Sequence, residues 1–213
     1  MNYSKDLIDF LNVSPVNYHA VKEVARRLDN AGYKYLSAEE KLGEVKAGDK
    51  FYVTKNDSSI YAFQIGKQTL GEAGFHIICA HSDSPTFRIK PNAEMTCERG
   101  MTKLNTEVYG GPIMSTWFDR PLSIAGRVII KTDDVMHPET RLLKVERPVL
   151  LIPNLAIHFN RQVNDGVKLS KQKDMLPIIG IVNDELEKGN MLMNLICSEL
   201  GVQKSDILDF DLY

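Results

Sequence analysis

The chain has 213 residues, of which 43% are hydrophobic and 25% charged, the usual mixture of a soluble globular protein. Its 26 Lys and Arg against 28 Asp and Glu leave a formal charge of −2, and without a basic block we expect neither a nucleic acid nor a membrane as partner. No run approaches the roughly 18 apolar residues of a membrane helix, and the N-terminus lacks a signal-peptide pattern. The odd, widely spaced Cys79, Cys97 and Cys197 argue against disulfides and predict a cytoplasmic location.

The first third of the chain predicts helices followed by strands. Apolar side chains recur at helical spacing over residues 18–28, and Gly32 stands where a C-terminal cap belongs. Ser37 and Glu40 fit the capping box of a second, short helix. Turn-forming residues 56–59 are expected between two strands, which are residues 50–54 and 60–65.

Residues 75–80 (FHIICA) form a short, almost continuously apolar run. This pattern predicts a strand buried on both faces, as in the centre of an α/β sheet. The character of the motifs changes after Pro91, so we expect a domain boundary near Pro91–Asn92. The chain would then divide into residues 1–91 and a mixed, β-rich unit of residues 92–213.

Further elements are expected in the second unit. Asn190 is expected to cap a helix that ends before Gly201. Apolar residues alternate with Asp209 and Asp211 at the C-terminal end, which predicts a strand with one buried face. The other expected strands are residues 102–109, 122–130 and 149–152.

The strongest chemical signal is residues 80–85 (AHSDSP), directly after the predicted buried strand. Ligands bind beyond the carboxyl ends of strands in an open α/β sheet. There His81 can offer a ring nitrogen to zinc, and Asp83 can orient a histidine through its other nitrogen. The alternative is that His81 only hydrogen-bonds a neighbouring loop. Spacing alone leaves both open, because no third ligand and no H-E-x-x-H or C-x-x-C motif is recognisable.

Two other stretches are unusual but have simpler explanations. Trp117 follows a Gly-Pro turn and fits a core or interface anchor, with Asp119 and Arg120 as a surface pair, although a catalytic role stays possible. His158 lies among apolar residues, which is typical of a core histidine. No G-x-S-x-G elbow or phosphate-binding glycine loop supports a serine-hydrolase or nucleotide-binding function.

Several long segments of the chain form one ordered set: FLNVSPVNYHAV, FYVTKNDSSIYAFQIG, GFHIICAHSDSPTFRIKP, YGGPIMSTWFDRPLSIAGRV, IPNLAIHFNRQVNDG, QKDMLPIIG and LDFDLY. Together these segments resemble the aspartyl aminopeptidase family of metallopeptidases, along essentially the whole chain. Ser82 in place of the more usual Thr, and Pro121 in place of an acidic residue, are small departures from the family pattern.

The resemblance implies an enzyme that removes an N-terminal residue, typically Asp or Glu, from a peptide. Such enzymes use two zinc ions with a water between them as nucleophile. His81 matches the first zinc ligand, and Asp83 matches the acidic residue that supports a metal-binding histidine. His158 matches a histidine that reaches a neighbouring subunit's active site, where it helps to hold substrate or stabilise the oxyanion. Homo-oligomerisation through the second domain is implied as well.

The family's other metal ligands lie beyond the equivalent of Tyr213. We therefore expect an α/β fold with part of a zinc-aminopeptidase catalytic sheet and an inserted, β-rich assembly domain. The chain would be a truncated half that is inactive by itself, because one recognisable ligand cannot hold two metals. The alternative is a non-catalytic binding or assembly module.

Overall fold

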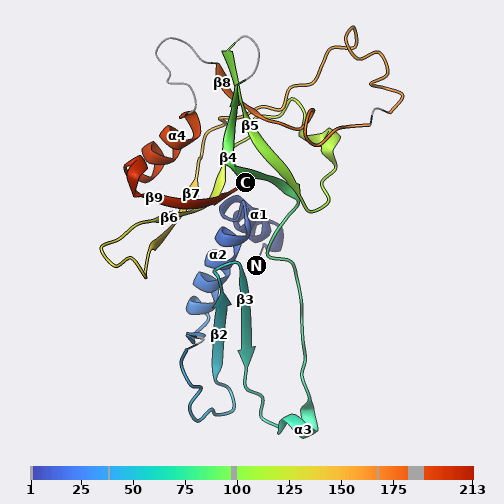
Figure 1. Ribbon diagram of the computed structural model, residues 1–213. Coiled ribbons are helices and arrows are strands. Elements are labelled where there is room, and N and C mark those ends of the chain that lie inside the picture. The colour runs from blue at the N-terminus through green and yellow to red at the C-terminus, as the bar shows by residue number, and fades with distance from the viewer. Residues whose placement is uncertain (1, 38, 97–99, 167, 182–189) are drawn as a thin grey trace. The chain divides into compact units, whose positions relative to one another are not determined.

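A computed structural model describes residues 2–37, 39–96, 100–166, 168–181 and 190–213, so Cys97 lies outside it. The chain forms two compact units, Met1–Ser84 and Pro85–Tyr213 (Figure 1). The boundary expected near Pro91–Asn92 falls inside strand β4 (Thr86–Thr96), where the register shifts between Ile89 and Glu94. No described helix is long and apolar enough to cross a membrane.

The first unit, residues 1–84, contains helices followed by a small sheet, as the sequence predicts. The order in the sheet is β1-β2-β3, with β1 parallel and β3 antiparallel to β2. Positive φ angles of 52° at Asn56 and 54° at Asp57 make the tight β2–β3 turn. The elements are α1 (Tyr3–Val13), α2 (Asn17–Asn30), β1 (Lys34–Tyr35), β2 (Lys50–Lys55), β3 (Ser59–Gln64) and α3 (Leu70–Ala73).

Two predictions for the first unit are wrong. Ser37 and Glu40 lie in a turn, in which the Glu40 amide donates to the Ser37 carbonyl at 3.1 Å, rather than in a helix. Residues 75–80 belong to no helix or strand and pair with no described strand, and Ile78 is 98% exposed. A strand is buried on both faces only when neighbours cover both faces, and the described residues do not supply them.

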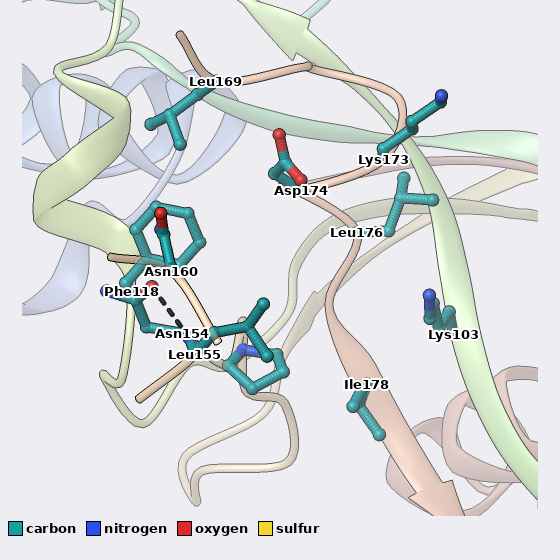
Figure 2. A pocket seen from close by; sticks show the side chains of 11 residues that line it. Lys103, Phe118, Asn154, Leu155, Asn160, Leu169, Lys173, Asp174, Leu176 and Ile178 are labelled. Carbon is teal, nitrogen blue, oxygen red and sulfur yellow. Dashed lines mark hydrogen bonds between the residues drawn. The ribbon is translucent and has the colours of Figure 1, made fainter. Parts of the chain in front are cut away.

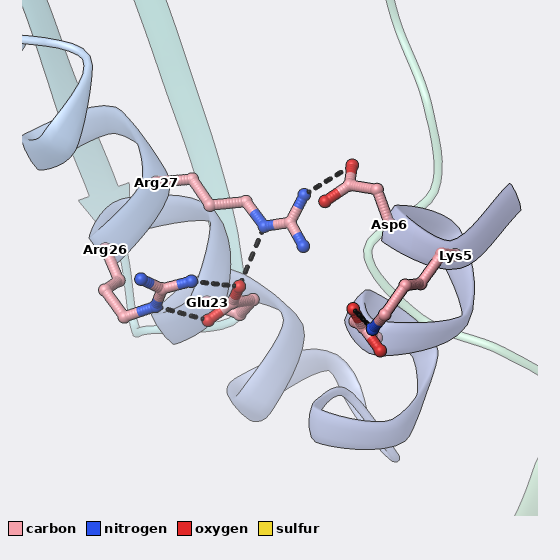
Figure 3. Close-up of polar contacts among 6 residues, drawn as sticks. Lys5, Asp6, Glu23, Arg26 and Arg27 are labelled. Atoms are coloured by element: carbon pink, nitrogen blue, oxygen red, sulfur yellow. Dashed lines mark hydrogen bonds and ion pairs between the residues drawn. The ribbon is translucent and has the colours of Figure 1, made fainter. Parts of the chain in front are cut away.

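A cluster of charged side chains joins α1 to α2 (Figure 3). Glu23 accepts hydrogen bonds from Arg26 at 2.7 Å and from Arg27 at 2.8 Å, and Arg27 also reaches Asp6 on α1 at 3.0 Å. The hydrogen bonds from Arg26, followed by those from Arg27, lower the pKa of Glu23 from its usual 4.5 to about 2. The folded state therefore favours the ionised carboxylate.

This cluster predicts a defined pH dependence of stability. Since the pKa of Glu23 is about 2 when folded and 4.5 ordinarily, its contribution is complete above pH 4.5 and is lost as the pH falls toward 2. Glu23→Gln should lower the melting temperature at pH 7. It should also make the melting temperature fall less steeply between pH 4.5 and about pH 2. Thermal melts followed by circular dichroism measure both effects. The exposed Glu44→Gln serves as the control. Parallel pH profiles for Glu23→Gln and the native chain would refute the prediction.

The second unit, residues 85–213, contains two antiparallel three-stranded sheets, ordered β4-β5-β8 and β7-β6-β9. The strands expected at 102–109 and at the C-terminal end are confirmed, whereas residues 149–152 make only isolated bridges. The elements after β4 are β5 (Met101–Tyr109), the 3-10 helix η2 (Met114–Trp117), β6 (Ala125–Ile130), β7 (Glu139–Lys144), β8 (Ile178–Ile181), α4 (Met191–Leu200), the 3-10 helix η3 (Lys204–Asp206) and β9 (Ile207–Leu212).

Apolar side chains from β-strands and α4 form the main core of this unit. Trp117 belongs to a second, smaller cluster, where its ring meets Phe87 edge-on with centroids 5.0 Å apart, as expected for an anchor. The most deeply buried members of the main core are Leu104, Ile124, Val128, Leu143, Leu192, Ile196 and Leu212.

Helix α4 confirms the prediction in its extent but not in its cap. It ends at Gly201, whose φ of 64° is the left-handed conformation that suits glycine. The Asn190 side chain does not cap its start. Instead, Glu94 on β4 accepts a hydrogen bond from the Leu192 amide at 2.7 Å, so a carboxylate distant in sequence satisfies a free N–H group.

Candidate functional site

His81 and Asp83, which the sequence predicts as site residues, lie next to each other near the end of the first unit. The Nδ1 atom of His81 lies 3.0 Å from Oδ1 of Asp83. The His81 side chain is 92% exposed and that of Asp83 is 33% exposed. When Nδ1 donates its proton to the carboxylate, the lone pair on Nε2 is left available to a metal. The structure therefore brings together two of the three predicted site residues, His81 and Asp83.

A neighbouring serine fixes the backbone between them. The Ser82 hydroxyl donates a hydrogen bond of 2.9 Å to the carbonyl of Ser58, which lies in the turn before β3. This contact links residues 24 positions apart and ties the His81–Asp83 loop to the sheet. The sequence does not predict this contact, because Ser82 stands out there only as a replacement for the more usual threonine and its partner is distant in the chain.

Removing this tether should loosen the loop without unfolding the unit. Ser82→Ala is expected to cost roughly 0.5–1.5 kcal/mol, the net worth of one hydrogen bond, and to speed amide exchange at residues 81–84. Ser82→Thr keeps the hydroxyl and should retain most of the protection. Hydrogen exchange measured by NMR separates the two variants, and equal exchange rates in both would mean that the hydroxyl does not hold the loop.

The arrangement fits one ligand of a metal site rather than a complete site. Among the described residues no group of three or more His, Cys, Asp or Glu side chains could hold a metal ion. A catalytic zinc site takes three protein ligands and leaves a position for water. His81, in contact with Asp83, has the chemistry and the exposure of one such ligand.

His158 lies in the second unit, and it is exposed, so the core-histidine interpretation is wrong. Its apolar neighbours are exposed as well, Leu155 to 61%, Ile157 to 50% and Phe159 to 80%. An exposed histidine framed by exposed apolar side chains is more typical of an interaction surface than of a core.

Asp119 holds the start of the His158 loop. Its backbone has a φ of 56°, its amide donates to the Ile152 carbonyl at 2.9 Å, and its carboxylate accepts from the Asn154 amide at 3.0 Å. Asp119 thus fixes the backbone at Asn154, four residues before His158. The pairing with Arg120 expected from the sequence does not predict this role. In the sequence, an Asp that follows two aromatic residues gives only a weak indication of this left-handed backbone conformation.

A cavity of about 330 Å³ lies beside the same loop (Figure 2). Its charged lining groups are Lys103, Lys173 and Asp174, and none of the predicted site residues lines it. All of its lining residues belong to the second unit. Its other lining residues are Phe118, Pro153, Asn154, Leu155, Asn160, Leu169, Leu176 and Ile178.

Comparison with known proteins identifies the family. The family model described as aminopeptidase I zinc metalloprotease (M18) matches residues 10–213. The chain belongs to the M18 aminopeptidase family. A probable M18 family aminopeptidase 2 of Clostridium acetobutylicum is 52% identical over 213 residues, which are 100% of this chain and 49% of that protein. The chain thus spans about half the length of the curated M18 relatives that it matches.

Solved M18-type structures share the fold of the whole chain. A chain of the Ape4 and Nbr1 complex matches with a TM-score of 0.90 and 36% identity, over 97% of this chain and 42% of that one. The S. cerevisiae mApe1 dodecamer matches with a TM-score of 0.79 and 27% identity, over 100% of this chain and 48% of that one. Both likenesses extend across the two units, so the α/β first unit and the β-rich second unit are features that M18 structures share.

Proposed function

We propose that the chain supplies the N-terminal half of the catalytic machinery of a metal-dependent aminopeptidase. The observation that carries the proposal is the His81–Asp83 pair, with Nδ1 engaged and the ring exposed, in a chain of the M18 family. His81 would hold a zinc ion through Nε2, and Asp83 would fix the orientation of the ring. A zinc ion bound there lowers the pKa of a coordinated water and polarises the scissile carbonyl.

We assign to the second unit a role in assembly. The exposed Leu155, Ile157 and Phe159 around His158 support a protein contact in this region. In that contact His158 would reach a neighbouring subunit and donate a hydrogen bond to the substrate carbonyl as negative charge develops on it. Asp119 would act as a positioning residue for this loop. The substrate would be a peptide, with an acidic N-terminal residue preferred. The exposed free thiol of Cys79 supports a reducing, cytoplasmic location.

A chimaera tests the proposed activity. Residues 1–213 would replace the matching half of the C. acetobutylicum relative, whose sequence is 52% identical. The folded chimaera should hydrolyse chromogenic amides of Asp or Glu, lose this activity with a chelator and regain it with zinc. The intact relative is the positive control. A folded, oligomeric chimaera that binds zinc and yet hydrolyses no aminoacyl substrate would contradict the proposal and favour a binding or assembly module.

A further inference from the structure

The cavity of about 330 Å³ in the second unit has both charged and apolar walls (Figure 2). Its volume lies at the lower end of the roughly 300–1,000 Å³ that ligand pockets occupy, so it suits a small molecule rather than a folded partner. None of the residues assigned to the proposed metal site lines it, so that site leaves the cavity unexplained. The apolar lining residues are Phe118, Pro153, Leu155, Leu169, Leu176 and Ile178.

Two sides of the cavity are fixed by contacts within the second unit. Lys103 on β5 lies opposite Ile178 on β8, so their side chains share one face of the sheet. Ile178 in turn exchanges two backbone hydrogen bonds, of 2.7 and 3.1 Å, with Leu151. Asp119 holds the next part of the wall, because its carboxylate accepts from the Asn154 amide at 3.0 Å. The cavity is therefore already formed in the fold, as ligand pockets usually are.

The charged groups of the lining are two ammonium groups and one carboxylate. Lys103 and Lys173 make no side-chain hydrogen bond or ion pair with any other residue that the structure describes. The Asp174 Oδ2 atom accepts a hydrogen bond of 2.6 Å from the Ser170 amide. That bond fixes the carboxylate and leaves its Oδ1 atom available to a ligand. Groups of both signs thus line one small, partly apolar volume.

This combination matches the chemistry of a free amino acid with an apolar side chain. Its α-carboxylate needs cationic donors, its α-ammonium group needs an anionic acceptor, and its side chain needs an apolar wall. We infer that the cavity is a binding site for such amino acids, in which Lys103 and Lys173 bind the carboxylate and Asp174 binds the ammonium group. An acidic side chain would meet the apolar lining, so this site differs from the proposed active site, where an acidic residue is preferred.

A ligand in the cavity also contacts the loop that carries His158. Leu155 and Asn160 both line the cavity, and His158 lies between them in the sequence. The loop turns there, since the Phe159 amide donates to the Ala156 carbonyl at 2.8 Å. Binding should therefore restrict the loop and slow its amide exchange. The inference is independent of the proposed function, because binding requires neither zinc nor catalysis.

The experiment titrates L-leucine into the full 213-residue chain and follows binding by isothermal titration calorimetry and NMR. We expect saturable binding with a dissociation constant of about 1 mM or lower, and shifts of the amide signals in the His158 loop. Two analogues test the recognition of each charged group, since isocaproate lacks the amine and leucinamide lacks the carboxylate. Each should bind at least about tenfold more weakly than L-leucine.

Matched variants test whether the ligand lies in the cavity. Lys103→Gln and Asp174→Asn each remove one charge but keep a polar side chain, so each should weaken L-leucine binding at least about tenfold. Lys171→Gln is the control, because Lys171 is exposed in the same segment as Asp174 and does not line the cavity. Its affinity should stay within about twofold. Circular dichroism checks the fold of each variant, and Lys173→Gln, at an exposed position, replaces Lys103→Gln if that variant does not fold.

Each outcome decides the inference. Absence of saturable binding to the native chain overturns it. Equal affinities for L-leucine and isocaproate would show that the cavity takes a simple carboxylate, which also overturns it. Equal weakening by Lys171→Gln and Lys103→Gln would place the ligand elsewhere, with the same consequence. An inactive chimaera together with intact L-leucine binding upholds the inference and counts against the proposed function alone.

Discussion

Gly126→Ala should destabilise the second unit by at least about 3 kcal/mol, a loss in the upper range for single substitutions. A Cβ at this position of β6 would lie 2.1 Å from the carbonyl oxygen of Asp211 and 2.9 Å from Cα of Leu212. Both atoms belong to the backbone of β9, which pairs with β6, so rotation of a side chain cannot relieve the clash. Alanine should therefore push β9 away from β6 and expose Leu212, which is fully buried.

Chemical denaturation followed by the fluorescence of Trp117, the only tryptophan and a residue of the second unit, measures this loss. Gly111→Ala is the matched control, since nothing lies within 4 Å of its added Cβ, and its stability should change by less than about 0.5 kcal/mol. A midpoint for Gly126→Ala that coincides with that of Gly111→Ala would show that β9 does not pack on β6 as described.

His81→Ala should have the largest effect on function in the chimaeric enzyme. In the proposed role, loss of Nε2 would remove a metal ligand, whereas Asp83→Ala would remove only the partner that orients it, a change worth roughly 10–100-fold in metal affinity or activity. We expect His81→Ala to exceed that loss and to lower the zinc content measured by atomic absorption.

His76→Ala is the control for this prediction, because His76 is also an exposed histidine and lies in residues 75–80, directly before His81. It should leave both zinc content and kcat/KM unchanged. Equal zinc content in His81→Ala and His76→Ala would remove His81 from the set of metal ligands.

Local pattern was sufficient for the elements whose partners are near in sequence. Strands β2 and β3 with their Asn56–Asp57 turn and the helix closed by Gly201 follow from spacing and turn chemistry. The His81–Asp83 contact is likewise local, because only Ser82 separates the two residues. Such features depend on the chain within a few residues, which is what a single sequence displays.

Contacts between distant residues could not be predicted in this way. Glu94 rather than Asn190 satisfies the start of α4, and Asp119 holds Asn154, because the folding of strands and loops brings them together. For residues 75–80 the sequence predicts a buried strand that the structure does not contain. Their apolar run predicts a strand that is covered on both faces, but burial depends on neighbours that composition does not reveal.

The identity of the zinc ligands is the central claim, and a crystal structure of the zinc-bound chimaera tests it most directly. We predict that Nε2 of His81 lies about 2.0–2.1 Å from a zinc ion while Nδ1 keeps its hydrogen bond to Asp83. A zinc ion held entirely by other side chains, with the His81 ring turned into solvent, would contradict the account.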